Sequence, residues 1–289
     1  MIRDNINQLI EEITRDYQQD DIFQAKKDFQ KTSGEIFEDD KSYESRMGSF
    51  LEWYTFERIC PDSALTPLQQ YLKSTSITPE SRELAEAISK GIHGLFIAKK
   101  IKSDYVIVVD VMDDEKYQVH ENQGAILFNP DDLFEGRLIP YRGNYYFTDH
   151  FCYHPKPTVG FIFSKVKDLK ASEKEALTKE KQLQKAIVSP QKSLKKTTDK
   201  IKKLNEKLVG TTKEKKIQSL KEDIAKLESD KSQLEAQISD IEIQLTELRT
   251  KVIQGEHRQN RFTLIRKLSY MSLKWERSRQ IDVRDIYQD

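Results

Sequence analysis

Apolar residues in the C-terminal half of the chain recur with the heptad spacing of a coiled coil. Between residues 217 and 252 they occupy the a and d positions, which face a partner helix and are called seam positions below, and only Lys231 interrupts them. These apolar seam residues are Ile217, Leu220, Ile224, Leu227, Leu234, Ile238, Ile241, Leu245, Leu248 and Val252. The pattern predicts a long helix with an almost complete coiled-coil seam.

The preceding segment has the same period but a weaker seam. Its best seam residues are Leu183, Ile187, Leu194, Ile201 and Leu204. Gly210 suits a helix end, and Thr212 suits the start of the next helix. Two limbs of similar length around a short turn predict an antiparallel coiled-coil hairpin over residues 161–258, with the turn near 209–212. The alternative is a parallel homodimer through the second limb, with the first limb packed outside.

The expected register of the hairpin brings its two defects together. Leu183 would lie opposite Ile238, and Pro190 opposite Lys231. Proline has no N–H and leaves a helical carbonyl without its donor, which a lysine ammonium nearby would satisfy. We therefore expect a kink or hinge near residue 190, formed by Pro190 and Lys231. The alternative is a kink beside which Lys231 only reaches solvent.

Residues 1–94 have the spacing of helices that cover another element. Apolar residues between 2 and about 30 recur every three or four positions and predict one helix there. The aromatic-rich segment around residues 47–56 has the same period and predicts a second helix. Thr66-Pro67 and Thr78-Pro79 each place an N-cap residue before a proline in the first helical turn. We interpret this region as a helical cap.

Residues 95–160 change to short β-branched and aromatic runs with turn residues between them. The runs are Leu95–Ile101, Tyr105–Val111, Lys116–His120, Leu133–Pro140 and Tyr145–Tyr153. They predict a small β domain, built as a five-stranded antiparallel β meander or a partly open barrel. The expected fold class is therefore α+β: N-terminal helices, the small β domain, and the long hairpin.

Charge divides the chain, although the formal net charge is zero. Residues 1–160 carry 18 Lys/Arg against 28 Asp/Glu, whereas residues 161–289 carry 30 against 20. Residues 259–289 form a basic, aromatic tail, which we expect to dock on the acidic N-terminal half. A basic half that meets an acidic partner is one alternative interpretation of this charge division. Another is that lysine simply fills the solvated faces of the helices.

Two cysteines without a disulfide framework, no signal-peptide pattern and no long apolar run indicate a cytoplasmic protein without a membrane-spanning segment. Glycines do not cluster into a phosphate-binding loop. We expect no cofactor and no catalytic residues.

One strand holds the best candidate for metal chemistry. His150, Cys152 and His154 alternate, so all three would share a face, and imidazole and thiolate are zinc ligands. No fourth ligand is evident, and the aromatic neighbours are typical of an ordinary strand. We therefore predict no metal site here.

The stretch from Arg46 to Pro155 resembles an uncharacterised region that accompanies SEC-C-type zinc motifs in bacterial proteins. The resemblance rests on Phe50–Tyr54, Thr66–Leu68 with Tyr71-Leu72, Val109–Val111, Tyr117–Val119 and Asp132–Pro140. The zinc motif itself is absent. The resemblance implies a helical cap followed by a small β domain, and no activity.

The function that the sequence favours is a non-enzymatic interaction or scaffolding protein, which uses the coiled-coil arm to associate with a protein partner or with a second copy as a homodimer. The alternative is a nucleic-acid-binding protein that uses the basic C-terminal half.

Overall fold

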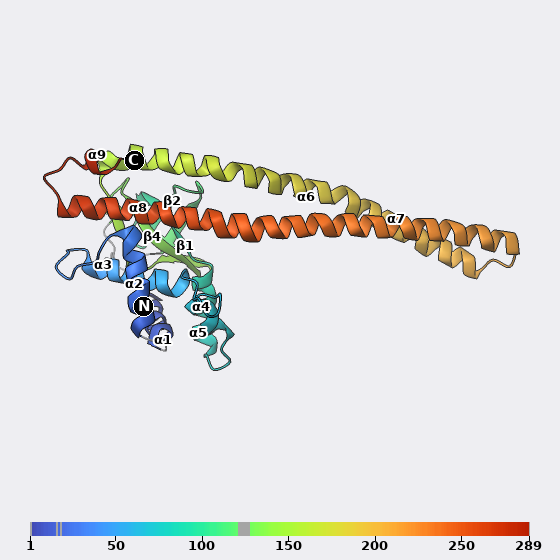
Figure 1. The fold of residues 1–289 in the computed structure, drawn as a ribbon, viewed down its shortest axis with the longest axis horizontal. Helices are drawn as coiled ribbons and strands as arrows, with labels where there is room; N and C mark the ends of the chain where they lie inside the picture. The colour runs from blue at the N-terminus through green and yellow to red at the C-terminus, as the bar shows by residue number, and fades with distance from the viewer. Residues whose placement is uncertain (1, 16, 18, 121–127, 289) are drawn as a thin grey trace. The chain divides into compact units, whose positions relative to one another are not determined.

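The computed structural model describes residues 2–15, 17, 19–120 and 128–288 (Figure 1). The chain divides into two compact units. The head unit comprises Met1–Asp168 and Arg261–Asp289, and the hairpin unit comprises Leu169–Asn260.

Five helices form the N-terminal part of the head unit. They are α1 (Ile2–Arg15), α2 (Gln19–Ser33), α3 (Tyr43–Phe56), α4 (Pro67–Lys73) and α5 (Pro79–Ser89). Thr66 and Thr78 cap α4 and α5 through their side chains, and Gln69 completes a capping box with Thr66. The single helix expected up to residue 30 is two helices, because the acidic pair Asp20 and Asp21 begins a new helix, where the helix dipole favours negative charge.

The β region forms one six-stranded mixed sheet, and the expected five-stranded antiparallel meander or partly open barrel is wrong. The strands are β1 (Ile92–Ile101), β2 (Tyr105–Asp110), β3 (Lys116–His120), β4 (Leu133–Tyr141), β5 (Asn144–Phe147) and β6 (Cys152–His154). Their order is β1-β2-β3-β5-β4-β6, with β1 also paired to β4. The run expected as one last strand divides into β5 and β6, which pair with different parts of β4, and β5 meets β3 in parallel.

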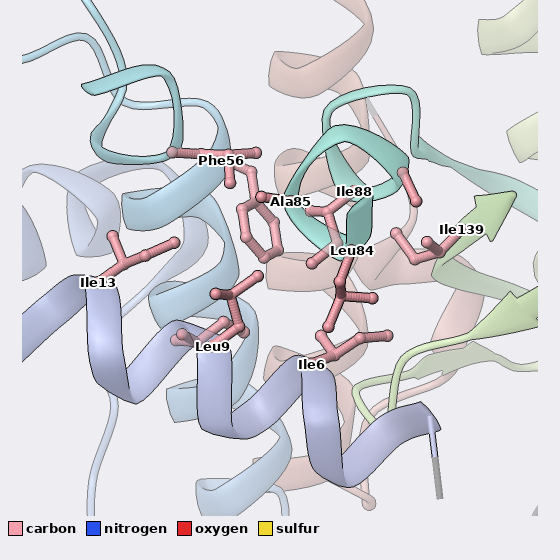
Figure 2. Packing of buried hydrophobic residues seen from close by; sticks show 11 residues of the cluster. Ile6, Leu9, Ile13, Phe56, Leu84, Ala85, Ile88 and Ile139 are labelled. Carbon is pink, nitrogen blue, oxygen red and sulfur yellow. The ribbon is translucent and has the colours of Figure 1, made fainter. Parts of the chain in front are cut away.

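Apolar side chains pack on both faces of β4. Ile139 joins a cluster with α1, α3, α4 and α5, in which Ile6, Leu9 and Ile88 are buried (Figure 2). Phe134 and Leu138 point to the opposite face and join a cluster that includes Phe96 and Phe147. Since successive strand residues alternate between faces, β4 is buried on both sides.

Long helices make up the hairpin unit. They are α6 (Val159–Val209), which enters the unit at Leu169, α7 (Glu214–Glu247) and the π-helical segment η2 (Leu248–His257). α6 and α7 run antiparallel and are joined by residues 210–213 (Figure 1). Along α7 the buried side chains are Leu220, Ile224, Ile241 and Leu245, all at seam positions.

An ion pair between the limbs shows that the expected register does not hold there. Glu180 Oε1 lies 2.7 Å from Arg249 Nε. The expected register places Glu180 opposite Ile241, which is eight residues, or about 12 Å along a helix, from Arg249. The heptad spacing of both limbs permits a shift of one heptad, which places Glu180 opposite Leu248, the neighbour of Arg249.

The two residues of the expected hinge lie in continuous helices. Pro190 is inside α6 and buried, and the helix continues on both sides of it. The ammonium of Lys231 lies 3.6 Å from Glu235 Oε1, one turn further along its own helix. The hinge therefore stays a prediction.

The C-terminal segment belongs to the head unit from Arg261 onward. It contains most of α8 (Arg258–Arg277) and the short α9 (Val283–Ile286). Ser272 of α8 donates a hydrogen bond to the carbonyl of Tyr153 in β6, and Arg277 pairs with Asp40. These contacts place α8 beside the charged face of the sheet described next.

Candidate functional site

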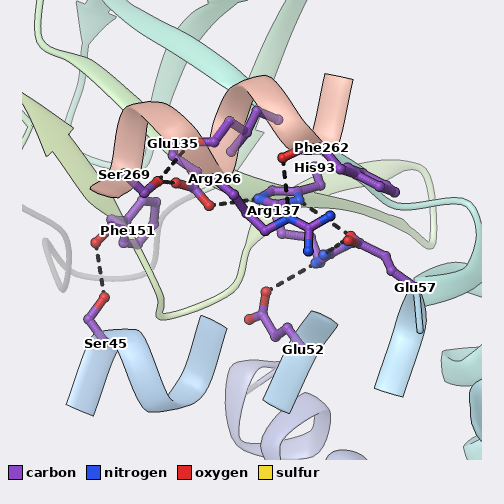
Figure 3. A network of polar contacts seen from close by, with 11 residues as sticks. Ser45, Glu52, Glu57, His93, Glu135, Arg137, Phe151, Phe262, Arg266 and Ser269 are labelled. Carbon is purple, nitrogen blue, oxygen red and sulfur yellow. Dashed lines mark hydrogen bonds and ion pairs between the residues drawn. The ribbon is translucent and has the colours of Figure 1, made fainter. Parts of the chain in front are cut away.

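One face of the sheet carries charged residues at positions where strands usually bury apolar ones. In β4, Glu135 and Arg137 alternate with the apolar residues of the opposite face. His93 in β1 lies directly opposite Arg137. All three side chains point toward α3 and α8 (Figure 3).

Arg137 is the centre of a buried ion-pair cluster. Its side chain is 4% exposed, and its Nε donates to Glu52 Oε2 at 3.0 Å. One terminal nitrogen donates to Glu57 Oε1 at the end of α3 (Figure 3). Burial would raise the pKa of Glu57, but the charges of Arg137 and His93 lower it to about 2. Glu57 is therefore ionised at neutral pH.

His93 connects this cluster to α8. Its Nε2 lies 2.8 Å from Glu135 Oε1, and its Nδ1 lies 3.3 Å from Glu57 Oε1. Burial would lower the pKa of His93, but the charge of the Glu57 carboxylate and the hydrogen bond with Glu135 raise it to about 9. Ser269 of α8 donates to the other oxygen of Glu135. Because His93 is protonated at neutral pH, it acts as a cation between two carboxylates.

A cavity of about 380 Å³ adjoins this cluster within the head unit. Its walls come from α2, α3, β1, β4, β6 and α8, and they include Glu57, His93 and Glu135. Aromatic side chains form much of the rest, namely Phe29, Trp53, Phe151, Tyr153 and Trp275. The volume and the mixed lining are typical of a small-molecule site.

Arg46 and Arg266 line the cavity and have no ionic partner among the described residues. Arg266 is only 9% exposed, and its Nε donates at 3.4 Å to Phe262 on its own helix. Arg46 donates from one terminal nitrogen to the carbonyls of Ser33 and Gly34, and its buried Nε has no hydrogen-bond partner. Burial lowers the pKa of both guanidinium groups, and nearby carboxylates oppose that change.

The three candidate metal ligands are not brought together. Cys152 and His154 line the cavity, but His150 packs against Gly48 of α3, where a Cβ would fall 1.9 Å from its ring. The Nδ1 of His154 lies 3.0 Å from the Tyr287 hydroxyl, and its Nε2 is buried without a partner. Among the residues that the structure describes, no group of three His, Cys, Asp or Glu side chains could hold a metal ion.

Two pairs of polar groups in the cavity lack the arrangement of an activated nucleophile. Glu135 lies between Ser269 and His93, so the imidazole contacts no hydroxyl from which it could take a proton. Burial raises the pKa of the Cys152 thiol to about 12, and burial lowers the pKa of His154 to about 4. A neutral thiol and a neutral imidazole are not an activated pair.

The predicted interaction residues lie in the hairpin unit, and the buried charge cluster was not predicted. The seam residues from Leu183 to Val252, with Pro190 and Lys231, belong to the hairpin unit.

The buried charge cluster had one signal in the sequence: Glu135 and Arg137 sit inside a strand that is otherwise apolar on both faces.

The fold defines an α+β protein with a six-stranded mixed sheet, a buried charge cluster and a long helical hairpin. Across the described ranges, no helix combines the length and the apolar character needed to cross a membrane. The chain belongs to a family of unknown function, DUF7986, whose model matches residues 1–193. This match does not confirm the resemblance to the region beside SEC-C-type zinc motifs. No curated protein and no solved structure matches the chain.

Proposed function

We propose that this protein is a non-enzymatic, cytoplasmic interaction or scaffolding protein, and that its hairpin unit is the part that contacts a protein partner. The observation that carries the proposal is that Leu169–Asn260 form a compact unit of their own from long helices. A two-helix hairpin buries only the stripe between its limbs, so its remaining faces are available to a partner. Two observations support a protein without catalytic activity. Cys152 and His154 are both neutral, and Glu135 separates the Ser269 hydroxyl from the His93 imidazole.

Photo-crosslinking in cells from matched positions tests this proposal. Ile243 on α7 is 57% exposed and Ile59 in the head unit is 55% exposed, so a photoreactive residue at either site has similar access to solvent. We expect a discrete protein adduct from Ile243, and none of the same mass from Ile59. An adduct with a second copy of the chain would show that the protein forms a homodimer. Adducts from Ile59 alone would contradict a hairpin-based interaction.

A basic end of the hairpin favours nucleic acid as the second candidate partner. Residues 192–221 contain eleven lysines against three acidic residues. None of these lysines forms an ion pair with another described residue, and those of residues 192–207 are exposed. Such a cluster would bind phosphates in a salt-dependent way.

Charge reversal separates the two candidates. Changing Lys196, Lys200 and Lys203 to Glu should abolish salt-sensitive retention of duplex DNA or RNA if nucleic acid is the partner. Changing the exposed head residues Lys90, Lys100 and Lys102 to Glu is the control with the same change in net charge. Absence of retention by the unmodified protein at low salt would leave the protein partner as the better candidate.

A further inference from the structure

The cavity of the head unit has a charge imbalance that the protein itself does not neutralise. Its charged lining residues are Arg46, Arg266, Arg279 and protonated His93 on one side, and Glu57, Glu135 and Glu276 on the other. Arg137 and Glu52, directly behind the wall, cancel each other. The lining therefore carries one positive charge in excess.

The carboxylates near Arg266 already have other partners. Glu57 Oε1 accepts from Arg137 and faces His93, whereas Glu57 Oε2 is buried without a hydrogen-bond partner. Both oxygens of Glu135 are bonded, one to His93 and the other to Ser269. Arg266 makes one long hydrogen bond through Nε, and its two terminal nitrogens have no partner in the described part of the chain. These donors are therefore open to an acceptor that enters the cavity.

The walls beside these donors are flat and apolar. The guanidinium carbon of Arg266 lies 5.6 Å from the centre of the Trp53 ring, and Phe151 and Tyr153 line the same cavity. His154 adds a buried Nε2 without a partner, because Tyr287 occupies only its Nδ1. A ligand with one anionic end and a planar apolar body matches the unused donors of Arg266 and the flat apolar walls.

We propose that this cavity binds a small aromatic carboxylic acid, whose carboxylate pairs with Arg266 and whose ring packs against Trp53 and Phe151. A guanidinium presents two parallel N–H donors that match the two oxygens of a carboxylate. One excess positive charge matches a monoanion better than a phosphate dianion. This site is independent of the proposed role of the hairpin unit.

Calorimetric titration of the full chain tests the proposal with three acids and their amides. The probes are benzoate, phenylacetate and indole-3-acetate, the corresponding neutral amides, and inorganic phosphate. We expect at least one acid to bind about tenfold or more tightly than its amide, because the amide cannot form the charged pair. Inorganic phosphate should bind more weakly than that acid, because it lacks the apolar body.

The variant Arg266→Met keeps the apolar stem and removes the charge, so it should weaken binding of that acid by about tenfold or more. Arg142→Met, an exposed arginine away from the cavity, is the matched control and should bind as the unmodified protein does. Equal affinity for an acid and its amide would overturn the proposal, and this comparison needs no variant to fold. So would binding of phosphate alone, or no binding of any acid at about 10 mM.

Discussion

The two units of this protein place their charges in opposite environments. In the head unit Arg137, Glu52 and Glu57 are almost completely removed from water and bond to one another. In the hairpin unit the charged side chains lie mostly in solvent, as in the pair between Arg249 and Glu180. Charge is therefore a structural element of the head unit and mainly a surface property of the hairpin unit. The same type of substitution should have very different effects in the two units.

The largest effect is expected from Arg137→Met. It would leave Glu52 buried without its cation and Glu57 with His93 alone, and we expect a loss of about 3–5 kcal/mol in the free energy of unfolding of the head unit. Both tryptophans, Trp53 and Trp275, lie in the head unit, so urea unfolding followed by tryptophan fluorescence reports on it alone. The control Arg142→Met removes an exposed pair with Glu83 and should cost about 0–1 kcal/mol. Equal losses in both variants would contradict the role assigned to Arg137.

A pH dependence of about 3 kcal/mol is expected next, from His93. Its pKa is about 9 in the folded protein and near 6.5 in the unfolded chain. The stabilisation is therefore fully present below pH 6.5 and is lost as the pH rises through 9, with an upper limit of about 3 kcal/mol. Urea midpoints at a series of pH values would measure it. The variant His93→Gln should flatten the profile, and an unchanged slope in that variant would assign the dependence to another group.

In the hairpin unit, the stability effect of a substitution should depend on how buried the side chain is rather than on its charge. Ile241 lies in the seam at 9% exposure, whereas Ile243, two residues further along α7, is 57% exposed. We expect Ile241→Ala to destabilise the hairpin by about 2 kcal/mol and Ile243→Ala by about 0.5 kcal/mol or less. Thermal unfolding followed by far-UV circular dichroism measures both. Similar losses would show that the limbs do not pack through the heptad seam.

The smallest effect is expected from the ion pair of the hairpin unit. Arg249→Ala should cost about 0–1 kcal/mol, because both partners remain accessible to water and salt screens them. The same thermal unfolding in low and high salt measures this effect. A loss as large as that of Arg137→Met would remove the distinction between the two units.

Local patterns in the sequence predicted most of the elements but not their long-range partners. The heptads predicted the helical hairpin, and the threonine–proline pairs predicted the starts of α4 and α5. The register was not predictable, because two seams with equal periods align equally well after a shift of one heptad. The mixed sheet was also missed, since its parallel pairing joins β3 to β5, two strands that are not consecutive in the sequence.

The candidate site could not be predicted from local sequence patterns, because its residues are far apart in the sequence. Glu52 and Arg137 bond across 85 positions of sequence, and Ser269 reaches Glu135 across 134. The cavity exists only where α3, β4 and α8 meet, so spacing along the chain could not reveal it. The useful signal was the pair of charges in β4, because ions inside a strand that is apolar on both faces need partners from elsewhere.

Hydrogen exchange followed by mass spectrometry on full-length Arg137→Met tests the comparison between the two units most directly. Peptides from β1, β4 and α3 should lose protection together, because the buried carboxylates of Glu52 and Glu57 no longer have Arg137 between them. Peptides from α7 between Leu220 and Leu245 should keep the protection that they have in the unmodified protein, since their seam is unchanged. An equal loss of protection in both sets of peptides would contradict the separate physical basis proposed for the head unit and the hairpin unit.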